Sequence, residues 1–153
     1  MNYCLIIIDM QYSFIASRDA KTILACKEEI KSAIKKGWYI FFIEYKGNGK
    51  TLKKLTNLTK DYDKVFVIKK NVDDGSSHIM KEVFNLGIVN AKFRVCGVNT
   101  SACIEHTVIG LSKWGRCGYK VEVISKAIND ECYDHWTESA IKSFKRSKNI
   151  NYI

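Results

Sequence analysis

Apolar and polar positions along the chain form two kinds of block. Short runs rich in β-branched and aromatic residues indicate buried strands, because they are too short for helices and lack a polar face. The longer blocks between them place apolar residues on one helical face and lysines on the other. Strands are predicted at 3–8, 38–43, 65–68, 93–98, 119–124 and 150–153, and helices at 19–36, 51–59, 77–86, 101–113 and 134–146.

This order of elements predicts the fold class. Strands that alternate with helices form a mainly parallel sheet covered by helices on both faces, which is an α/β architecture of three layers. No change in composition marks a linker and no repeat is present, so residues 1–153 are predicted to form a single domain. In such sheets the ligand site lies outside the carboxyl ends of the strands.

Polar residues follow three of the predicted strands. Asp9 ends the first strand, the pair Lys69 and Lys70 ends the third, and a polar turn leads from the fourth to Cys103. We expect these groups to meet at one edge of the sheet. An ammonium group stabilises a thiolate, and a carboxylate can take the thiol proton, so the three groups together suggest a nucleophilic site.

Cys103 lies in the stretch 94–107, which predicts a strand, a tight turn and a helix. Asn99, Thr100 and Ser101 are turn and cap residues, so Cys103 falls in the first turn of the helix. The unpaired N–H groups there predict a thiol pKa below its ordinary value, although an ionised Asp9 opposes this shift. On this stretch alone, a buried structural cysteine fits as well as a nucleophile.

Charge and composition narrow the classes of partner. The net charge is 25 − 16 = +9, and eight lysines accompany Asp61 and Asp63 between Lys46 and Lys70, a local balance of 8 − 2 = +6. No aromatic residues alternate with these lysines, which argues against nucleic acid. No apolar run approaches the ~20 residues of a membrane span. Without a signal-peptide pattern, the predicted location is cytoplasmic, where the six cysteines stay reduced.

Two motifs resemble those of the isochorismatase-like cysteine hydrolases. One is Leu5-Ile-Ile-Ile-Asp9-Met-Gln11 followed by Phe14, and the other is Cys96-Gly-Val-Asn-Thr-Ser-Ala-Cys103-Ile. The resemblance extends from residue 5 to about residue 127. It implies a three-layer α/β/α Rossmann-like sandwich, a small-molecule substrate and assembly into a homo-oligomer.

The resemblance also implies a catalytic triad of an aspartate, a lysine and a cysteine. Asp9 and Cys103 match the two motifs directly. The family's lysine stands at the end of the third strand, where this chain has two. Counting from the start of that strand selects Lys69 and leaves Lys70 as the alternative.

The groups around the nucleophile follow from the same resemblance. It implies a cis peptide between Val98 and Asn99, and an oxyanion hole formed by the N–H groups of Asn99 and Cys103. Gln11 and Phe14 come shortly after Asp9, so both are expected in the wall of the substrate pocket.

One family feature is missing from the sequence. Nicotinamidases of this family bind a metal through an Asp-x-His motif after the second strand and through a later histidine. Here residues 43–47 read Ile-Glu-Tyr-Lys-Gly, and the first histidine of the chain is His78. The chain is therefore predicted to bind no metal, to need no cofactor and to differ from a nicotinamidase.

The leading hypothesis is a metal-independent cysteine hydrolase that cleaves a C–N bond of a small amide-type substrate through a Cys103 thioester. The nearest variant is a vinyl-ether hydrolase of isochorismatase type, which would need Asp9 but no covalent step. Two other classes stay open. The chain could be a non-catalytic binding or scaffold member with a vestigial site, or a thiol redox protein that uses Cys103 and Cys96.

Overall fold

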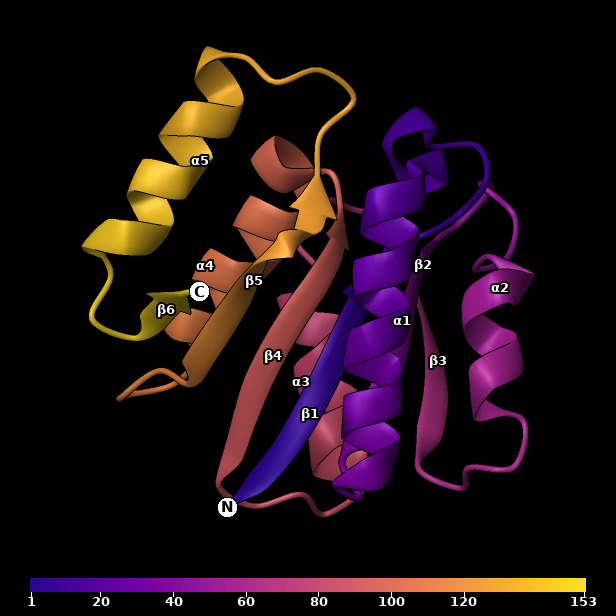
Figure 1. Cartoon of the computed structure of the whole chain (residues 1–153). Helices are drawn as coiled ribbons and strands as arrows, with labels where there is room; N and C mark the ends of the chain where they lie inside the picture. The colour runs from indigo at the N-terminus through magenta and orange to yellow at the C-terminus, as the bar shows by residue number, and fades with distance from the viewer.

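The computed structural model describes all 153 residues, and its centre is a six-stranded sheet (Figure 1). The strand order is β3-β2-β1-β4-β5-β6, and every neighbouring pair runs parallel. The predicted α/β class with a mainly parallel sheet is therefore confirmed. The strands are β1 (Asn2–Ile8), β2 (Tyr39–Tyr45), β3 (Val65–Lys70), β4 (Ala91–Val98), β5 (Lys120–Asn129) and β6 (Ile150–Tyr152).

Helices cover both faces of the sheet and complete the three layers (Figure 1). One face packs against α1 and α2, and the other against α3, α4 and α5. None of these helices combines the length and apolar character that a membrane crossing requires. Their bounds are α1 (Ala20–Lys35), α2 (Lys53–Thr56), α3 (Ser76–Asn85), α4 (Glu105–Ser112) and α5 (His135–Arg146), with short 3-10 turns η1 (Ile15–Arg18) and η2 (Asn57–Thr59) and a π-helical turn η3 (Thr100–Ile104).

The central strand β1 shows how a continuous apolar run supplies both cores. Side chains alternate between the two faces of a strand. Leu5 and Ile7 therefore pack in the core with α1, whereas Ile6 and Ile8 pack in the core with α3 and α4. Because both faces are covered, the run contains no polar position from residue 4 until Asp9, where the strand has ended.

Gly97 lies against the backbone of β1 at the carboxyl end of the sheet. Gly97 has a φ of 119° and pairs with Ile8, and a Cβ at this position would collide with the Ile8 backbone. Only glycine tolerates both the positive φ and this approach. Asp9 and Asn99 directly follow these two paired strands, so they leave the sheet at the same edge.

A partly buried charge network joins α1 to β4 and β5. Arg94 Nε and Nη2 donate to the two Glu29 carboxylate oxygens at 2.6 and 3.0 Å, and its Nη1 donates to Glu122 Oε2 at 2.8 Å. Lys92 Nζ lies 2.6 Å from the other Glu122 oxygen. Arg94 binds Glu29 in a bidentate manner and also binds Glu122, so the loss of Arg94 would remove a guanidinium partner from both carboxylates.

Candidate active site

Three side chains from distant parts of the chain meet beyond the carboxyl ends of the strands. Asp9 follows β1, Lys70 is the last residue of β3, and Cys103 lies in η3 shortly after β4. Lys70 Nζ joins them, since it lies 3.0 Å from Asp9 Oδ2 and 3.2 Å from Cys103 Sγ. The exposed fractions of Asp9, Lys70 and Cys103 are 1%, 0% and 6%. The polar ends of these strands thus form one enclosed cluster.

The backbone at Asp9 turns its carboxylate into this cluster. Asp9 has a φ of 51°, its N–H donates to the Ile43 carbonyl at 3.0 Å, and its carbonyl accepts from Gln11 N–H at 2.7 Å. A positive φ at a residue with a Cβ is unfavourable and persists where neighbouring contacts enforce it. Carboxylate Oδ2 binds Lys70, while Oδ1 is buried without a partner. Oδ1 is therefore free to accept a proton from a reacting group.

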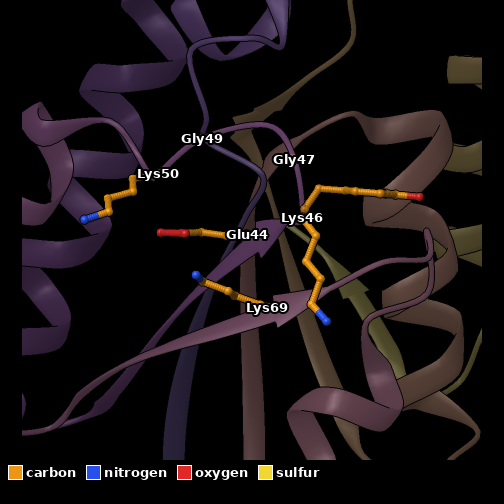
Figure 2. Close-up of a pocket in the computed structure, with 7 residues that line it drawn as sticks. Glu44, Lys46, Gly47, Gly49, Lys50 and Lys69 are labelled. Carbon is orange, nitrogen blue, oxygen red and sulfur yellow. The ribbon is translucent and has the colours of Figure 1, made fainter.

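The structure does not support Lys69, the preferred sequence assignment, and instead brings the alternative, Lys70, to this cluster. β3 continues two residues past its predicted end, and its pairing with β2 places Lys69 beside Glu44 and Lys70 beside Tyr45. Adjacent side chains on a strand point to opposite faces, so only one of the two lysines can face Asp9. Lys69 is exposed and lines a separate cleft with Glu44 (Figure 2).

The Lys70 ammonium group makes contacts with all three of its protons. Beyond Asp9 and Cys103, Nζ donates to the Val72 carbonyl at 3.1 Å. The ring of Tyr45 lies against the same group, with its centroid 4.2 Å from Nζ, and adds a cation–π interaction. These contacts hold Nζ between the carboxylate and the thiol and fix the distance at which it acts on each.

A π-helical turn presents Cys103. The Ile104 N–H donates to the Asn99 carbonyl at 3.1 Å, an i→i+5 bond that widens the turn to the π form, and the Ala102 N–H donates to the same carbonyl at 3.2 Å. The N–H of Ser101 is capped by the Asp130 carboxylate at 3.1 and 3.2 Å. π-Helical turns of this kind occur often at functional sites. The sequence had predicted an ordinary helix start here, because the i→i+5 bonds leave no residue signature.

The peptide between Val98 and Asn99 is cis, as the family resemblance predicted. Among the backbone hydrogen bonds outside helices and strands, none uses the Asn99 N–H. This group therefore remains available as a donor. The oxyanion hole formed by Asn99 and Cys103 stays a prediction, since no substrate oxygen marks its position.

The sequence predicts a lowered pKa for the Cys103 thiol, and this prediction is wrong, because the surroundings of the thiol raise its pKa. Burial, followed by the charge of the Asp9 carboxylate, raises the pKa of Cys103 to about 12, and Lys70 offsets these effects only in part. Burial also raises the pKa of Asp9 above its usual value, against the lowering effect of Lys70, and Asp73 adds a smaller rise. The Cys103 thiol is therefore neutral at neutral pH, and attack requires a base to take its proton.

The two predicted pocket residues differ in what they contact. The Gln11 amide donates to the Tyr45 carbonyl at 3.0 Å and the Gly49 carbonyl at 2.7 Å, and its oxygen accepts from Tyr45 N–H at 2.8 Å. Its hydrogen-bonding groups thus position the loop after β2. Phe14 is half-buried and meets the Tyr45 ring edge-on, with centroids 6.5 Å apart. Phe14 therefore lies beside the ring that covers Lys70.

Sequence reasoning missed Asp73 as a member of this site. Asp73 Oδ1 lies 3.8 Å from Cys103 Sγ. The sequence of residues 73–76, Asp-Asp-Gly-Ser, is typical of a turn that leads into a helix, and Asp74 Oδ1 indeed accepts from Ser76 N–H at 2.8 Å. An aspartate that only forms a turn and an aspartate that lies at a site have the same local sequence pattern. Only the packing of this loop against Cys103 shows that Asp73 belongs to the site.

The position after β2 does not suit a metal ion. There Glu44, Lys46, Lys50 and Lys69 line a cleft of about 250 Å³, and Figure 2 shows the Lys50 and Lys69 side chains on either side of the Glu44 carboxylate. Ammonium groups repel cations, and no group of three or more histidine, cysteine, aspartate or glutamate side chains comes together in the structure. These residues do not fit the metal of the family's nicotinamidases.

The fold and this cluster together define an α/β protein with an aspartate, a lysine and a cysteine gathered at the carboxyl edge of a parallel sheet. The isochorismatase domain matches residues 3–150. This match extends over nearly the whole chain, so the protein belongs to the isochorismatase family. The sequence resemblance is therefore confirmed.

Solved structures with the same fold include enzymes that differ in substrate. The nicotinamidase of Staphylococcus aureus is 22% identical, with a TM-score of 0.83 over 100% of both chains. The N-carbamoylsarcosine amidase of Thermoplasma acidophilum is 17% identical, with a TM-score of 0.75 over 99% of this chain and 95% of its own. The MAR1 ribonuclease of Caenorhabditis elegans is 18% identical, with a TM-score of 0.83 over 99% of this chain and 76% of its own. Comparison with curated protein sequences found no match. At these identities the likeness shows the fold alone.

Proposed function

We propose that this protein is a metal-independent cysteine hydrolase that cleaves a C–N bond of a small amide-type substrate through a thioester on Cys103. The observation that carries the proposal is the contact of one buried ammonium group, Lys70 Nζ, with both Asp9 and Cys103. Apolar residues of similar volume often stabilise a fold as well as a buried ion pair does, so a functional reason for this pair is favoured. Family membership and the two amidase neighbours support amide hydrolysis as the reaction class.

The first half of the proposed reaction forms the thioester. Asp9 Oδ1 takes the thiol proton as Cys103 Sγ attacks the amide carbon, and the carbonyl oxygen becomes an oxyanion. The N–H groups of Asn99 and Cys103 donate to this oxyanion. Asp9 then gives its proton to the amide nitrogen, the C–N bond breaks, and the amine leaves with the acyl group bound to sulfur.

The second half releases the acid. Asp9, again a carboxylate, takes a proton from a water molecule while the water oxygen attacks the thioester carbon. The second tetrahedral intermediate breaks its C–S bond, and the proton on Asp9 returns to the Cys103 sulfur. The Lys70 ammonium group stabilises the sulfur whenever it carries negative charge. The products are one carboxylic acid and one amine, and the net co-reactant is one water.

The metal-independent part of the proposal rests on the lysine side chains that occupy the region after β2. In this proposal backbone N–H groups, and not a metal ion, polarise the substrate carbonyl. Such groups stabilise the developing negative charge when they are fixed in place. Assembly into a homo-oligomer and a cytoplasmic location remain predictions from the sequence.

A non-catalytic member with a vestigial site is the competing proposal. The enclosed thiol, 6% exposed, with a pKa raised to about 12, favours it, because such a thiol is a weak nucleophile until a base acts on it. The two proposals differ in whether Asp9 can deprotonate Cys103 when a substrate binds.

The deciding experiment measures ammonia released from nicotinamide, acetamide, propionamide and glycinamide, with mass spectrometry of the quenched protein. The hydrolase proposal expects ammonia release by the natural protein, an acyl adduct on the Cys103 peptide, and neither signal in Cys103→Ala. Asp9→Asn should also lose turnover while it retains the thiol. Ammonia release that equals the Cys103→Ala background for every amide, with no acyl adduct, would count against the hydrolase proposal and favour the vestigial site.

A further inference from the structure

We infer that Asp73 selects substrates by charge, so that the site favours amides with a cationic or hydrogen-bond-donating group near the scissile bond and disfavours anionic ones. This inference rests on the proposed function, because it concerns the substrate of the same site. It adds a specificity-determining residue that neither the family motifs nor the triad contains.

Asp73 is the exposed member of the cluster. Its Oδ1 lies 3.8 Å from Cys103 Sγ, and the residue is exposed, whereas Asp9 and Lys70 are buried. A ligand that arrives from solvent therefore meets the Asp73 carboxylate before it reaches the inner groups. A substituent of the reacting carbonyl that lies on this side of the sulfur would be close to the Asp73 carboxylate.

The loop that carries Asp73 is fixed in this position. Thr107 Oγ1, on α4, donates to the Asp73 carbonyl at 3.3 Å and accepts from Gly75 N–H at 2.9 Å. A Cβ at Gly75 would lie 3.2 Å from the Lys70 side chain, so the loop packs directly on the catalytic lysine. These contacts anchor the Asp73 backbone to α4, the helix that continues from the turn bearing Cys103.

The charges of the cluster leave Asp73 uncompensated. Asp9 and Lys70 form an ion pair at 3.0 Å and together contribute −1 + 1 = 0. Asp73 takes part in none of the ion pairs of the structure, so the neutral-thiol site carries a net charge of −1. A charge at this distance attracts cations and repels anions, and exposure to solvent moderates the effect without reversing it. The same carboxylate would repel the carboxylic acid product after ionisation and favour its release.

The test uses thiol reagents of different charge, which report the field at the sulfur without requiring turnover. Cys117 and Cys132 are exposed, so both are replaced by serine in every sample. Labelling of Cys103 is timed with methyl methanethiosulfonate and with its cationic trimethylammonioethyl and anionic sulfonatoethyl analogues. The ratio of the cationic to the anionic rate should exceed one, and Asp73→Asn should lower this ratio by about tenfold.

Asp74→Asn is the matched control, since it removes the same charge at the neighbouring position. The Asp74 carboxylate caps the N–H of Ser76 instead of facing Cys103. This substitution should leave the ratio within about twofold of its original value. A fall of less than about threefold in Asp73→Asn, or an equal fall in Asp74→Asn, would overturn the inference. A uniform loss of labelling with all three reagents would also overturn it and would assign Asp73 the role of proton acceptor.

A substrate comparison separates this inference from the proposed function. Glycinamide is cationic, propionamide is neutral and succinamate is anionic. If hydrolysis occurs, Asp73→Asn should reduce the preference in kcat/KM for glycinamide over succinamate, mainly through KM. If none of them is hydrolysed, the proposed function loses support, and the labelling ratios still decide the role of Asp73.

Discussion

Lys70 Nζ lies 3.2 Å from Cys103 Sγ, although 33 positions separate the two residues, while the adjacent Lys69 points to the other face of the sheet. An ammonium group at this distance stabilises a sulfur anion much more than a neutral thiol. The relationship therefore predicts an effect on thiol reactivity that a purely structural lysine would not produce.

Lys70→Met should slow the alkylation of Cys103 by iodoacetamide at pH 7.5 by about tenfold or more, because the thiolate loses its only nearby cation. Lys69→Met, which removes the same charge from the opposite face of β3, serves as the control and should react like the natural protein. The measurement is the rate of labelling of the Cys103 peptide by mass spectrometry. Equal rates in the two variants would remove the lysine from the proposed triad.

Asp9→Asn should separate thiol reactivity from turnover. The Asp9 carboxylate is one of the causes that raise the pKa of Cys103 to about 12, and its removal leaves Lys70 as the nearest charge. The thiol pKa should therefore fall, and alkylation at pH 7.5 should accelerate by about tenfold, while amide turnover is lost with the base.

The pH profile of labelling checks the sign of this effect. Between pH 7 and 10 the natural protein should react faster with every step in pH, because these values lie below the pKa of its thiol. Asp9→Asn should reach its plateau at lower pH. A profile in the variant displaced to higher pH would contradict the assignment of Asp9 as the group that opposes thiolate formation.

Gln11→Ala should destabilise the protein by about 1–3 kcal/mol, because it leaves the Tyr45 N–H without its acceptor and removes one donor from the Tyr45 and Gly49 carbonyls in a partly buried place. Ser13→Ala removes a hydroxyl that bonds the same loop at an exposed position, so it should have little effect. Urea unfolding followed by circular dichroism measures both. A loss in Gln11→Ala no larger than in Ser13→Ala would show that the amide does not hold this loop.

Arg94→Met should lower the free energy of unfolding by about 2–3 kcal/mol at pH 7, because Glu29 and Glu122 then lose their guanidinium partner in a largely buried place. The loss is limited to this range because the Arg94 side chain is partly open to solvent, which weakens the ion pairs. Lys126→Met removes a lysine from a fully exposed pair with Glu28 and is the control, with no measurable loss expected.

The contribution of this network should depend on pH. Although burial raises the pKa of Glu122, hydrogen bonds from Lys92 and Arg94 outweigh it and hold the pKa below its usual value. A carboxyl group with a lowered folded-state pKa stabilises the fold above its unfolded-state pKa, and this stability is lost as pH falls through the folded-state value. The difference between Arg94→Met and the natural protein should therefore shrink in acid, and a difference that grows there would contradict the ion-pair explanation.

Periodicity was sufficient to predict the five α-helices and the six strands of this chain, because a sheet buried on both faces requires uninterrupted apolar runs and surface helices require amphipathic ones. Errors occurred at element ends. β3 extends to Lys70 and β5 to Asn129, since hydrogen bonds to neighbouring strands continue through polar residues. Local sequence contains no information about how far a neighbouring strand reaches.

The sequence by itself determined the α/β class, the family, and the aspartate and cysteine of the candidate site, because each depends on local pattern or on a motif within about ten residues. Tertiary structure decided which lysine joins them, since the choice between Lys69 and Lys70 depends on the face to which each points within a paired strand. It also reversed the expected pKa of Cys103, because burial is a property of the assembled core and outweighs the nearby lysine. Asp73 entered the site for the same kind of reason, since its distance to Cys103 is set by the packing of a loop on α4.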